Sequence, residues 1–267
     1  MNSIRWHVFW QCVFNFFEGF VVNGVINVII PALEKRFELS SSRSGFIASA
    51  NDIGALVVLL FVGYFGERRH KPRVMAAGIF IMCLGCFVFA LPQFIGGKYN
   101  YILSGEKIVP STCDSTTEET KTTSNTEYYA MFVIGQILLG LGAAPMFTIG
   151  LTYIDENCKA KVTSFHISLT FCTAALGVSV GFIVGGQTLA LFVDADKVDI
   201  NSVPLTPDDP QWVGAWWIGI LIALGGLFIS AIPISGYPKR LPGKYHAINH
   251  AVDSLSIKIL KLTCTDF

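Results

Sequence analysis

The chain has 267 residues, of which 52% are apolar and 14% are charged, and its 19 basic and 19 acidic residues cancel. Its mean hydropathy of +0.54 is clearly positive, which excludes an ordinary soluble domain of this size and makes lipid part of the solvent. With no net positive charge and no cluster of basic and aromatic residues, the sequence gives no support for nucleic-acid binding.

Six apolar runs are long enough to cross about 30 Å of hydrocarbon as helices. They occupy residues 8–31, 46–65, 74–95, 129–154, 165–193 and 213–234. Strand-like alternation is absent from these runs, and a helix satisfies every backbone polar group internally. The sequence therefore predicts an all-α membrane protein, in which residues 1–237 form a bundle of six transmembrane helices and residues 238–267 follow it.

The first run carries five polar residues on one half of the helix. They are Gln11, Asn15, Glu18, Asn23 and Asn27. A carboxyl group within a membrane span is costly unless it faces a cavity, finds a partner or stays protonated. Glu18 is therefore either a group of a substrate cavity or proton pathway, or a carboxyl hydrogen-bonded to a neighbouring helix. Asp52 in the second run has the same two interpretations.

The loop between the second and third runs has two glycines and a basic cluster, in the pattern Gly, two residues, Gly-acid-Arg and further basic residues. This pattern resembles the loop that transporters of the major facilitator superfamily carry at the same place. The resemblance implies a role in a cytoplasmic gate for Gly63, Arg68, Arg69 and Arg73.

Small residues mark the fourth and fifth runs. Pro145 removes a backbone hydrogen bond from the fourth, so a kink is expected there. In the fifth, Gly177, Gly181 and Gly185 lie on one helical face and allow a neighbouring helix to approach closely. That contact is either fixed packing or a surface that slides during transport.

Basic residues outside the runs are distributed unevenly, with twelve in the N-terminus, the second and fourth loops and the C-terminal tail, and seven in the other loops. The excess of basic residues on one side places both termini in the cytoplasm. By the same division Cys158 is cytoplasmic and Cys113 is external.

No catalytic, metal-binding or cofactor-binding pattern is present, since a phosphate-binding glycine loop, a G-x-S-x-G turn and a helical histidine pair are all missing. Cys83 and Cys86 have the spacing of a redox or metal motif, but a single pair in an apolar helix favours packing. An intramembrane enzyme is the weaker alternative to a non-enzymatic membrane protein.

At the outer end of the sixth run stands the stretch Asp-Pro-Gln-Trp-Val-Gly-Ala-Trp-Trp-Ile-Gly at residues 209–219, and it closely resembles the signature of organic anion transporting polypeptides. The matching residues are Asp209, Trp212, Gly214, Ala215, Trp216 and Trp217. Gln211 stands where that family generally has arginine. Indole rings suit the membrane interface, so the stretch is either an interfacial anchor with close packing or a direct substrate contact.

Further stretches resemble the family from about residue 20 to residue 243, among them Ala90-Leu-Pro92, although Gln93 stands where many members have histidine. The resemblance implies the N-terminal half of a major facilitator fold, with residues 238–267 opening the central cytoplasmic linker and a second six-helix half as partner. It also implies sodium-independent, secondary-active or facilitative transport of small amphipathic organic anions across the plasma membrane by alternating access. The alternative is a non-transporting short form that acts as a membrane partner.

Overall fold

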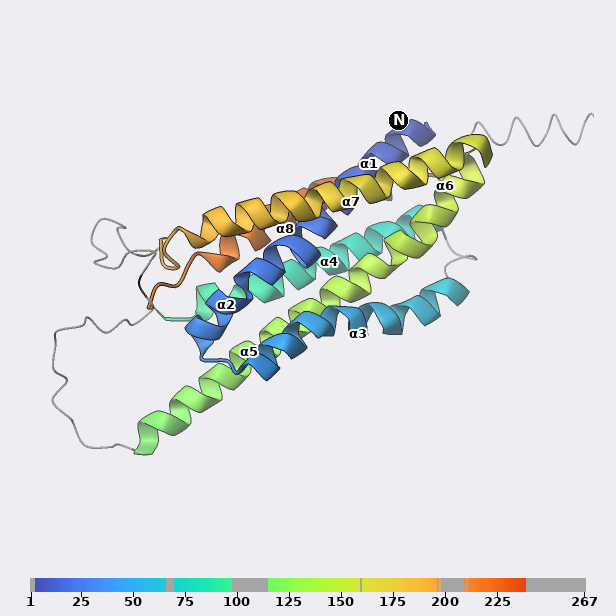
Figure 1. Cartoon of the computed structure of the whole chain (residues 1–267). Coiled ribbons are helices and arrows are strands. Elements are labelled where there is room, and N and C mark those ends of the chain that lie inside the picture. Colours follow the sequence, from blue (N-terminus) through green and yellow to red (C-terminus); the bar gives the residue numbers. More distant parts are fainter. Residues whose placement is uncertain are drawn as a thin grey trace, which may run out of the picture.

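A computed structural model describes residues 3–65, 70–97, 115–158, 160–195, 197, 209 and 211–238 of the chain, with the backbone only at 65, 115–125 and 160–161. Within these residues the chain forms six helices that are long and apolar enough to cross a membrane, which confirms the predicted all-α architecture. The helices run side by side along one common direction (Figure 1). The end at which the first helix begins is called the N-terminal end, and the opposite end is called the distal end.

The first and fourth spans are each broken by π-helical turns. The first consists of α1 (Ile4–Glu18), η1 (Gly19–Val25) and α2 (Ile26–Phe37). The fourth consists of α5 (Ser115–Pro145), η2 (Met146–Gly150) and α6 (Leu151–Asn157). The second break begins directly after Pro145, where the missing N–H of proline was expected to disturb the helix.

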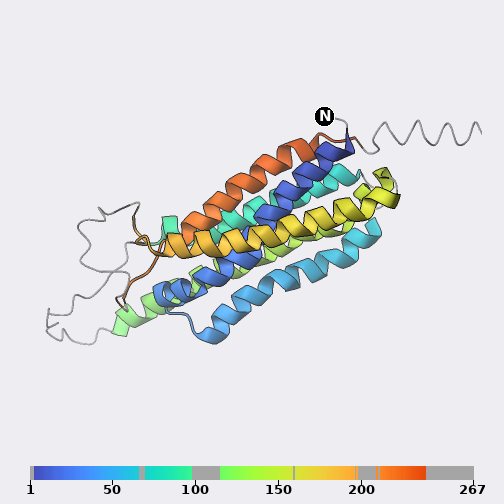
Figure 2. The ribbon, with the colours of Figure 1, turned by 45° about the horizontal axis from the view of Figure 1, so that its top comes forward.

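The other four spans are continuous helices. They are α3 (Ser41–Phe65), α4 (Lys71–Ile95), α7 (Ala160–Leu189) and α8 (Trp216–Ser235). Going round the bundle, the order of neighbours is α3, α5, α4, α8, the first span and α7. The two ends of this series, α3 and α7, lie at the lower and upper edges of the bundle in Figure 1. In the view of Figure 2, α3 again forms the lower edge, while α8 forms the upper edge and α7 crosses between them.

These two edge helices are the least covered, because only 17% of the apolar window of each is buried, against 44–61% in the other four spans. In water such a large exposed apolar surface would favour aggregation. Contact with lipid or with a second apolar bundle removes that surface from water. The bundle core lies instead between α4, α5, α8 and the first span, where Phe14, Phe89, Phe132 and Trp216 are fully buried.

The fifth and sixth spans differ from their predicted bounds at the distal end. The fifth ends at Leu189 rather than at 193, and the sixth begins at Trp216 rather than at 213. The reason is an isolated antiparallel bridge between Phe192 and Gly214, which holds this part of the chain extended. Phe192, Val193, Val213 and Ala215 are buried without being helical, so hydropathy alone overextends both helices.

At the N-terminal end, an aromatic contact joins the first span to the fourth span and to the segment after α8. The fully buried ring of His7 lies 4.6 Å from the ring of Tyr153 and 5.0 Å from that of Tyr237. The Tyr153 hydroxyl donates to the carbonyl of Pro238 at 2.9 Å. The three elements are thus fixed relative to one another at this end.

Glycines let the first span and α7 approach at backbone distance. A Cβ atom at Gly177 would collide with the carbonyl oxygen of Phe16, and one at Gly181 with that of Phe20. Gly185 lies against the side chain of Val28, so all three glycines face the first span. A second set brings α5 against α3, where Gly140 meets the backbone of Asn51. Such contacts replace the missing hydrophobic driving force between helices in lipid.

This close approach predicts opposite effects for two substitutions in one helix. Gly177→Ala should destabilise the bundle by about 1–3 kcal/mol, because the methyl group forces the two backbones apart. Gly186→Ala meets open space and should be neutral or stabilising by up to about 1 kcal/mol from helix propensity. Thermal unfolding of both variants in detergent micelles checks the difference; equal unfolding temperatures for the two would contradict the packing.

Candidate functional site

Three polar residues of the predicted set are buried along the first span. Asn15 donates from Nδ2 to the carbonyl of Thr170 in α7 at 3.2 Å. Gln11 is 1% exposed, and its amide lies against Gly150 in η2. The first span is therefore joined to the fifth span by a side-chain hydrogen bond and packs a buried amide against the fourth.

Glu18 lies in the same row and is 7% exposed. Among the described residues its carboxyl group forms no hydrogen bond and no ion pair. It is the last residue of α1, directly before the π-helical turn η1. Turns of this kind are rare and occur frequently at functional sites, because their wider winding re-aims the side chains that follow.

Asn23 and Asn27 lie beyond that turn and are both exposed. The Asn27 side chain donates from Nδ2 to the carbonyl of Asn23 at 2.8 Å. Between them, Gly24 packs against Gly181 of α7. Because η1 contains more residues per turn than an α-helix, it changes the rotational position of the residues that follow it. We call the five residues Gln11, Asn15, Glu18, Asn23 and Asn27 the polar row; its members are buried in α1 and exposed in η1 and α2.

Asp52 lies apart from this row. It is exposed on α3, which packs against α5 and makes smaller contacts with α2 and η2. The two hollows described below are not lined by Asp52 or by any residue of the polar row. The part of the row that is open is Asn23 and Asn27.

The second hollow lies at the N-terminal end, next to the loop for which a gate role is expected. Its volume is about 230 Å³, and Gly63, Lys71, Thr148 and Thr152 are among its lining residues. Lys71 is almost buried and forms an ion pair of 2.6 Å with Glu156 of α6. This pair joins the start of the third span to the end of the fourth. It lies where two opposite charges are partly shielded from water, so the attraction is stronger than at an open surface.

Of the other expected gate residues, Arg73 is exposed in the first turn of α4 and Gly63 is exposed near the end of α3. Arg68 and Arg69 lie outside the described residues.

At the distal end, the tryptophan-rich stretch connects three spans. Trp212 Nε1 donates to the carbonyl of Leu189 at 2.9 Å, and Trp217 Nε1 donates to that of Val193 at 3.0 Å. Gly214 packs so closely on Leu189 that a Cβ atom would collide with the backbone there. The stretch thereby caps the end of α7 with the start of α8.

Gln93 near the end of α4 joins the same connection. Its Nε2 donates to the carbonyl of Val193 at 3.1 Å and to the carboxylate of Asp194 at 3.2 Å. Lys197 in turn donates to the carbonyl of Gln93 at 2.9 Å.

Trp216 is fully buried in the bundle. Its ring packs edge-on against Phe37, Phe89 and Phe132, with centroid distances of 6.0, 6.3 and 5.6 Å. Ala215 is also buried, whereas Trp212 and Trp217 are half-buried, and Asp209 is half-buried at the start of the stretch. In this arrangement the stretch packs against the bundle, and the indole N–H groups of Trp212 and Trp217 donate hydrogen bonds to backbone carbonyls.

Two polar features of the bundle were not identified from the sequence. The Lys71–Glu156 pair joins residues 85 positions apart, and neither residue alone carries a distinguishing signal. Gln136 in α5 is 1% exposed, and its Oε1 has no hydrogen-bond partner in the described part of the chain. An amide inside an apolar run is a signal that the sequence does offer, because such a group needs a partner in the membrane.

Comparison with known proteins matches this arrangement to one family. The family model described as Organic Anion Transporter Polypeptide (OATP) matches residues 6–257. Solute carrier organic anion transporter family member 4A1 of Mus musculus is 38% identical over 96% of this chain and 36% of its own length. Member 4C1 of Homo sapiens is 39% identical over 87% of this chain and 32% of its own. The chain thus spans about a third of the length of these relatives.

A solved structure supports the fold. The crystal structure of a D-xylose-proton symporter superposes with a TM-score of 0.64 at 15% identity, covering 96% of this chain and 54% of that one. At this identity the likeness concerns the fold alone. It confirms the predicted class, a six-helix half of a major facilitator fold.

The ion pair predicts unequal effects for its two partners. Glu156→Gln leaves the buried ammonium of Lys71 without a counter-charge and should destabilise the bundle by about 1–3 kcal/mol. Lys71→Met leaves Glu156, which is 44% exposed and can be hydrated, and should cost less. Unfolding temperatures in detergent measure both; a greater loss in Lys71→Met would contradict this account.

Proposed function

The chain belongs to the organic anion transporter polypeptide family, and on that premise we propose that it forms one six-helix half of a carrier for amphipathic organic anions. The carrier moves them across the plasma membrane by alternating access, without sodium and without ATP. The observation that carries this proposal is the polar row of the first span, which is open at Asn23 and Asn27 although the bundle around it is apolar.

The shape of the bundle supports a second half as partner. The polar row is exposed at Asn23 and Asn27, and the edge helices α3 and α7 leave most of their apolar surface uncovered. A second bundle against these helices would close a cavity over the row. Binding between two halves near the membrane midplane is the arrangement that alternating access requires.

The charges indicate what each half contributes. None of the six predicted runs contains lysine or arginine, so the charged groups within them are the carboxyls of Glu18 and Asp52, and the other members of the polar row are amides. An anion needs a positive partner or a helix N-terminus in the membrane. We assign that cation to the second half, and to Glu18 a place in the cavity, where its carboxyl without a protein partner meets water or a proton.

The alternative is a six-helix product that does not transport and acts as a membrane partner protein. It draws on the observation that the chain spans about a third of its relatives' length. Uptake of a labelled steroid sulfate by cells separates the two possibilities. Two proteins are compared: the 267-residue chain alone, and a chimera in which residues 6–257 replace the matching segment of the mouse 4A1 relative.

The chimera should show saturable uptake, and the double substitution Asn23→Leu/Asn27→Leu should lower it about tenfold, because it removes two polar contacts with the substrate or its water. Leu84→Ala, at an exposed position on α4, is the matched control and should leave uptake unchanged. Surface expression of each variant is measured by biotinylation. A chimera that reaches the surface without saturable uptake would contradict the proposal.

Both termini are proposed to be cytoplasmic, which a membrane-impermeant maleimide tests through single-cysteine variants. A chain that keeps only Cys158 should be labelled only after permeabilisation, whereas one that keeps only Cys113 should be labelled in intact cells. Burial, and then the nearby carboxylate of Asp155, raise the pKa of the Cys158 thiol, so less thiolate is present at neutral pH. Its labelling should therefore accelerate from pH 7 to pH 9. Labelling of Cys158 in intact cells would reverse the topology.

A further inference from the structure

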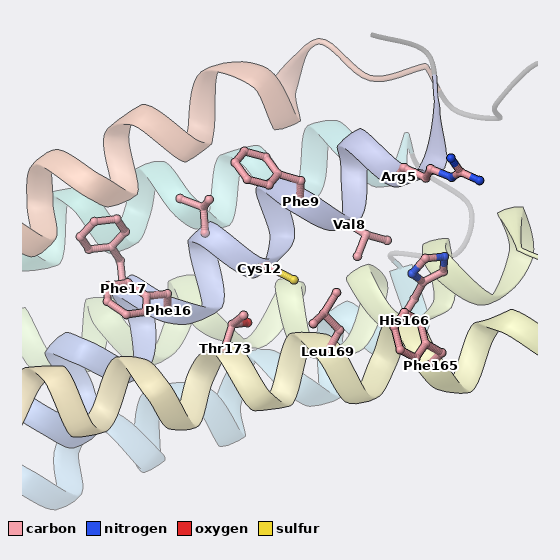
Figure 3. Close-up of a pocket in the computed structure, with 11 residues that line it drawn as sticks. Arg5, Val8, Phe9, Cys12, Phe16, Phe17, Phe165, His166, Leu169 and Thr173 are labelled. Atoms are coloured by element: carbon pink, nitrogen blue, oxygen red, sulfur yellow. The ribbon is translucent and has the colours of Figure 1, made fainter.

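The larger of the two hollows is an apolar groove between α1 and α7 that the transport proposal does not use. Its volume is about 560 Å³. Phe9, Phe16, Phe165 and Leu169 are among its walls, and Phe9, Phe165 and Leu169 are exposed (Figure 3). Cys12 and Val8 are buried at its floor. The groove is open along its length, so its walls are in contact with whatever surrounds the bundle.

The polar groups of the groove are concentrated at one end. Arg5 and His166 face each other across its N-terminal end, one from α1 and one from α7 (Figure 3). Arg5 is exposed, and Nδ1 of His166 has no hydrogen-bond partner among the described residues. From this end the walls are hydrocarbon and aromatic rings, with Cys12 and Thr173 as the other weakly polar side chains. The groove therefore has a cationic mouth and an apolar body.

The length of the groove corresponds to half a bilayer. Arg5 and Phe17 mark its two ends along α1, twelve positions apart, which is about 18 Å of helix. One leaflet contributes about 15 Å of hydrocarbon. An acyl chain lying in the groove would thus reach from the headgroup level at Arg5 to the membrane midplane near Phe17.

From this arrangement we infer that the groove is a binding site for an anionic phospholipid of the leaflet at the N-terminal end. One acyl chain lies between α1 and α7, and the phosphate accepts hydrogen bonds from Arg5 and His166. A guanidinium group suits this role because its paired N–H groups match phosphate oxygens. The cytoplasmic leaflet is the one that carries anionic lipids, and basic pockets between helices there bind their headgroups.

The position of the groove argues against the transported anion as its occupant. The groove is lined by Phe9, Val13 and Phe16 of the first span. The polar row consists of other residues of that span, among them the buried Gln11, Asn15 and Glu18, and none of them lines the groove. A bound lipid would cover the seam between α1 and α7 above the contact made by Gly177 with Phe16. The inference rests on the proposed cytoplasmic position of the termini, but it does not depend on transport.

Native mass spectrometry of the purified 267-residue chain tests the site with two probes, phosphatidylserine and phosphatidylcholine. The wild type should retain phosphatidylserine in preference to phosphatidylcholine. In Arg5→Ala the preference should fall about fivefold, and in Arg5→Ala/His166→Ala it should approach parity. Arg73→Ala, which removes an exposed arginine at the same end but outside the groove, should leave the preference unchanged.

A second variant tests the apolar body without touching the charges. Leu169 is 40% exposed, so Leu169→Trp is tolerated by the fold while it fills the groove, and it should lower retention of both lipids. Equal retention of the two lipids by the wild type would overturn the inference, as would an equal loss in Arg73→Ala. Displacement of phosphatidylserine by a steroid sulfate, one for one, would also overturn it and assign the groove to the transported anion. Uptake by the chimera is measured separately, so the lipid site and the transport proposal fail independently.

Discussion

The backbone contact between the first span and α7 is the constraint on which the remaining arrangement depends. In lipid, apolar side chains gain little by leaving the surroundings, so two helices are held by how closely they approach. Gly177 and Gly181 allow that approach, and the Asn15 side chain adds a hydrogen bond to the Thr170 carbonyl at the same seam. With this seam fixed, η1 turns Asn23 and Asn27 to the open side of the bundle.

The ends of the bundle are held by different chemistry from its middle. At the N-terminal end an ion pair and an aromatic contact around His7 connect the first, third and fourth spans and the segment that follows α8. At the distal end the indole N–H groups of Trp212 and Trp217 hold backbone carbonyls at the end of α7. Both kinds of contact are directional and local, whereas the glycine seam is continuous. Together they hold the bundle as one body, which is what the proposed rocking of one half against another requires.

Much of the fold could be predicted from the sequence, because hydropathy over about 20 residues and the internal satisfaction of backbone groups leave few alternatives to helices. The break after Pro145 followed from the missing N–H of that residue. The π-helical turn after Glu18 did not, because π-helical winding depends on tertiary contacts such as that of Gly24 with Gly181 rather than on a local residue type. The predicted fifth and sixth helices are too long for a related reason. Hydropathy indicates which residues are buried, but it does not indicate whether the backbone there is helical.

The site was predictable only in part for the same reason. Polar residues in an apolar run, such as Asn15 and Glu18, can be identified from the sequence. The partner of Asn15 cannot, because Thr170 lies 155 positions away. Neither the pairing of Lys71 with Glu156 nor the place of Trp216 inside an aromatic cluster is visible without the fold.

The central claim is that the open part of the polar row faces water between two halves of a carrier. The most direct measurement is the reaction rate of a water-soluble thiol reagent with a single cysteine at Asn27 or at Phe9, each in the cysteine-free chimera. The account predicts rapid reaction for Asn27→Cys, slowed by a saturating transported anion, and slow reaction for Phe9→Cys, which lies in the lipid groove. Equal rates at both positions, or a faster reaction at Phe9→Cys, would contradict it.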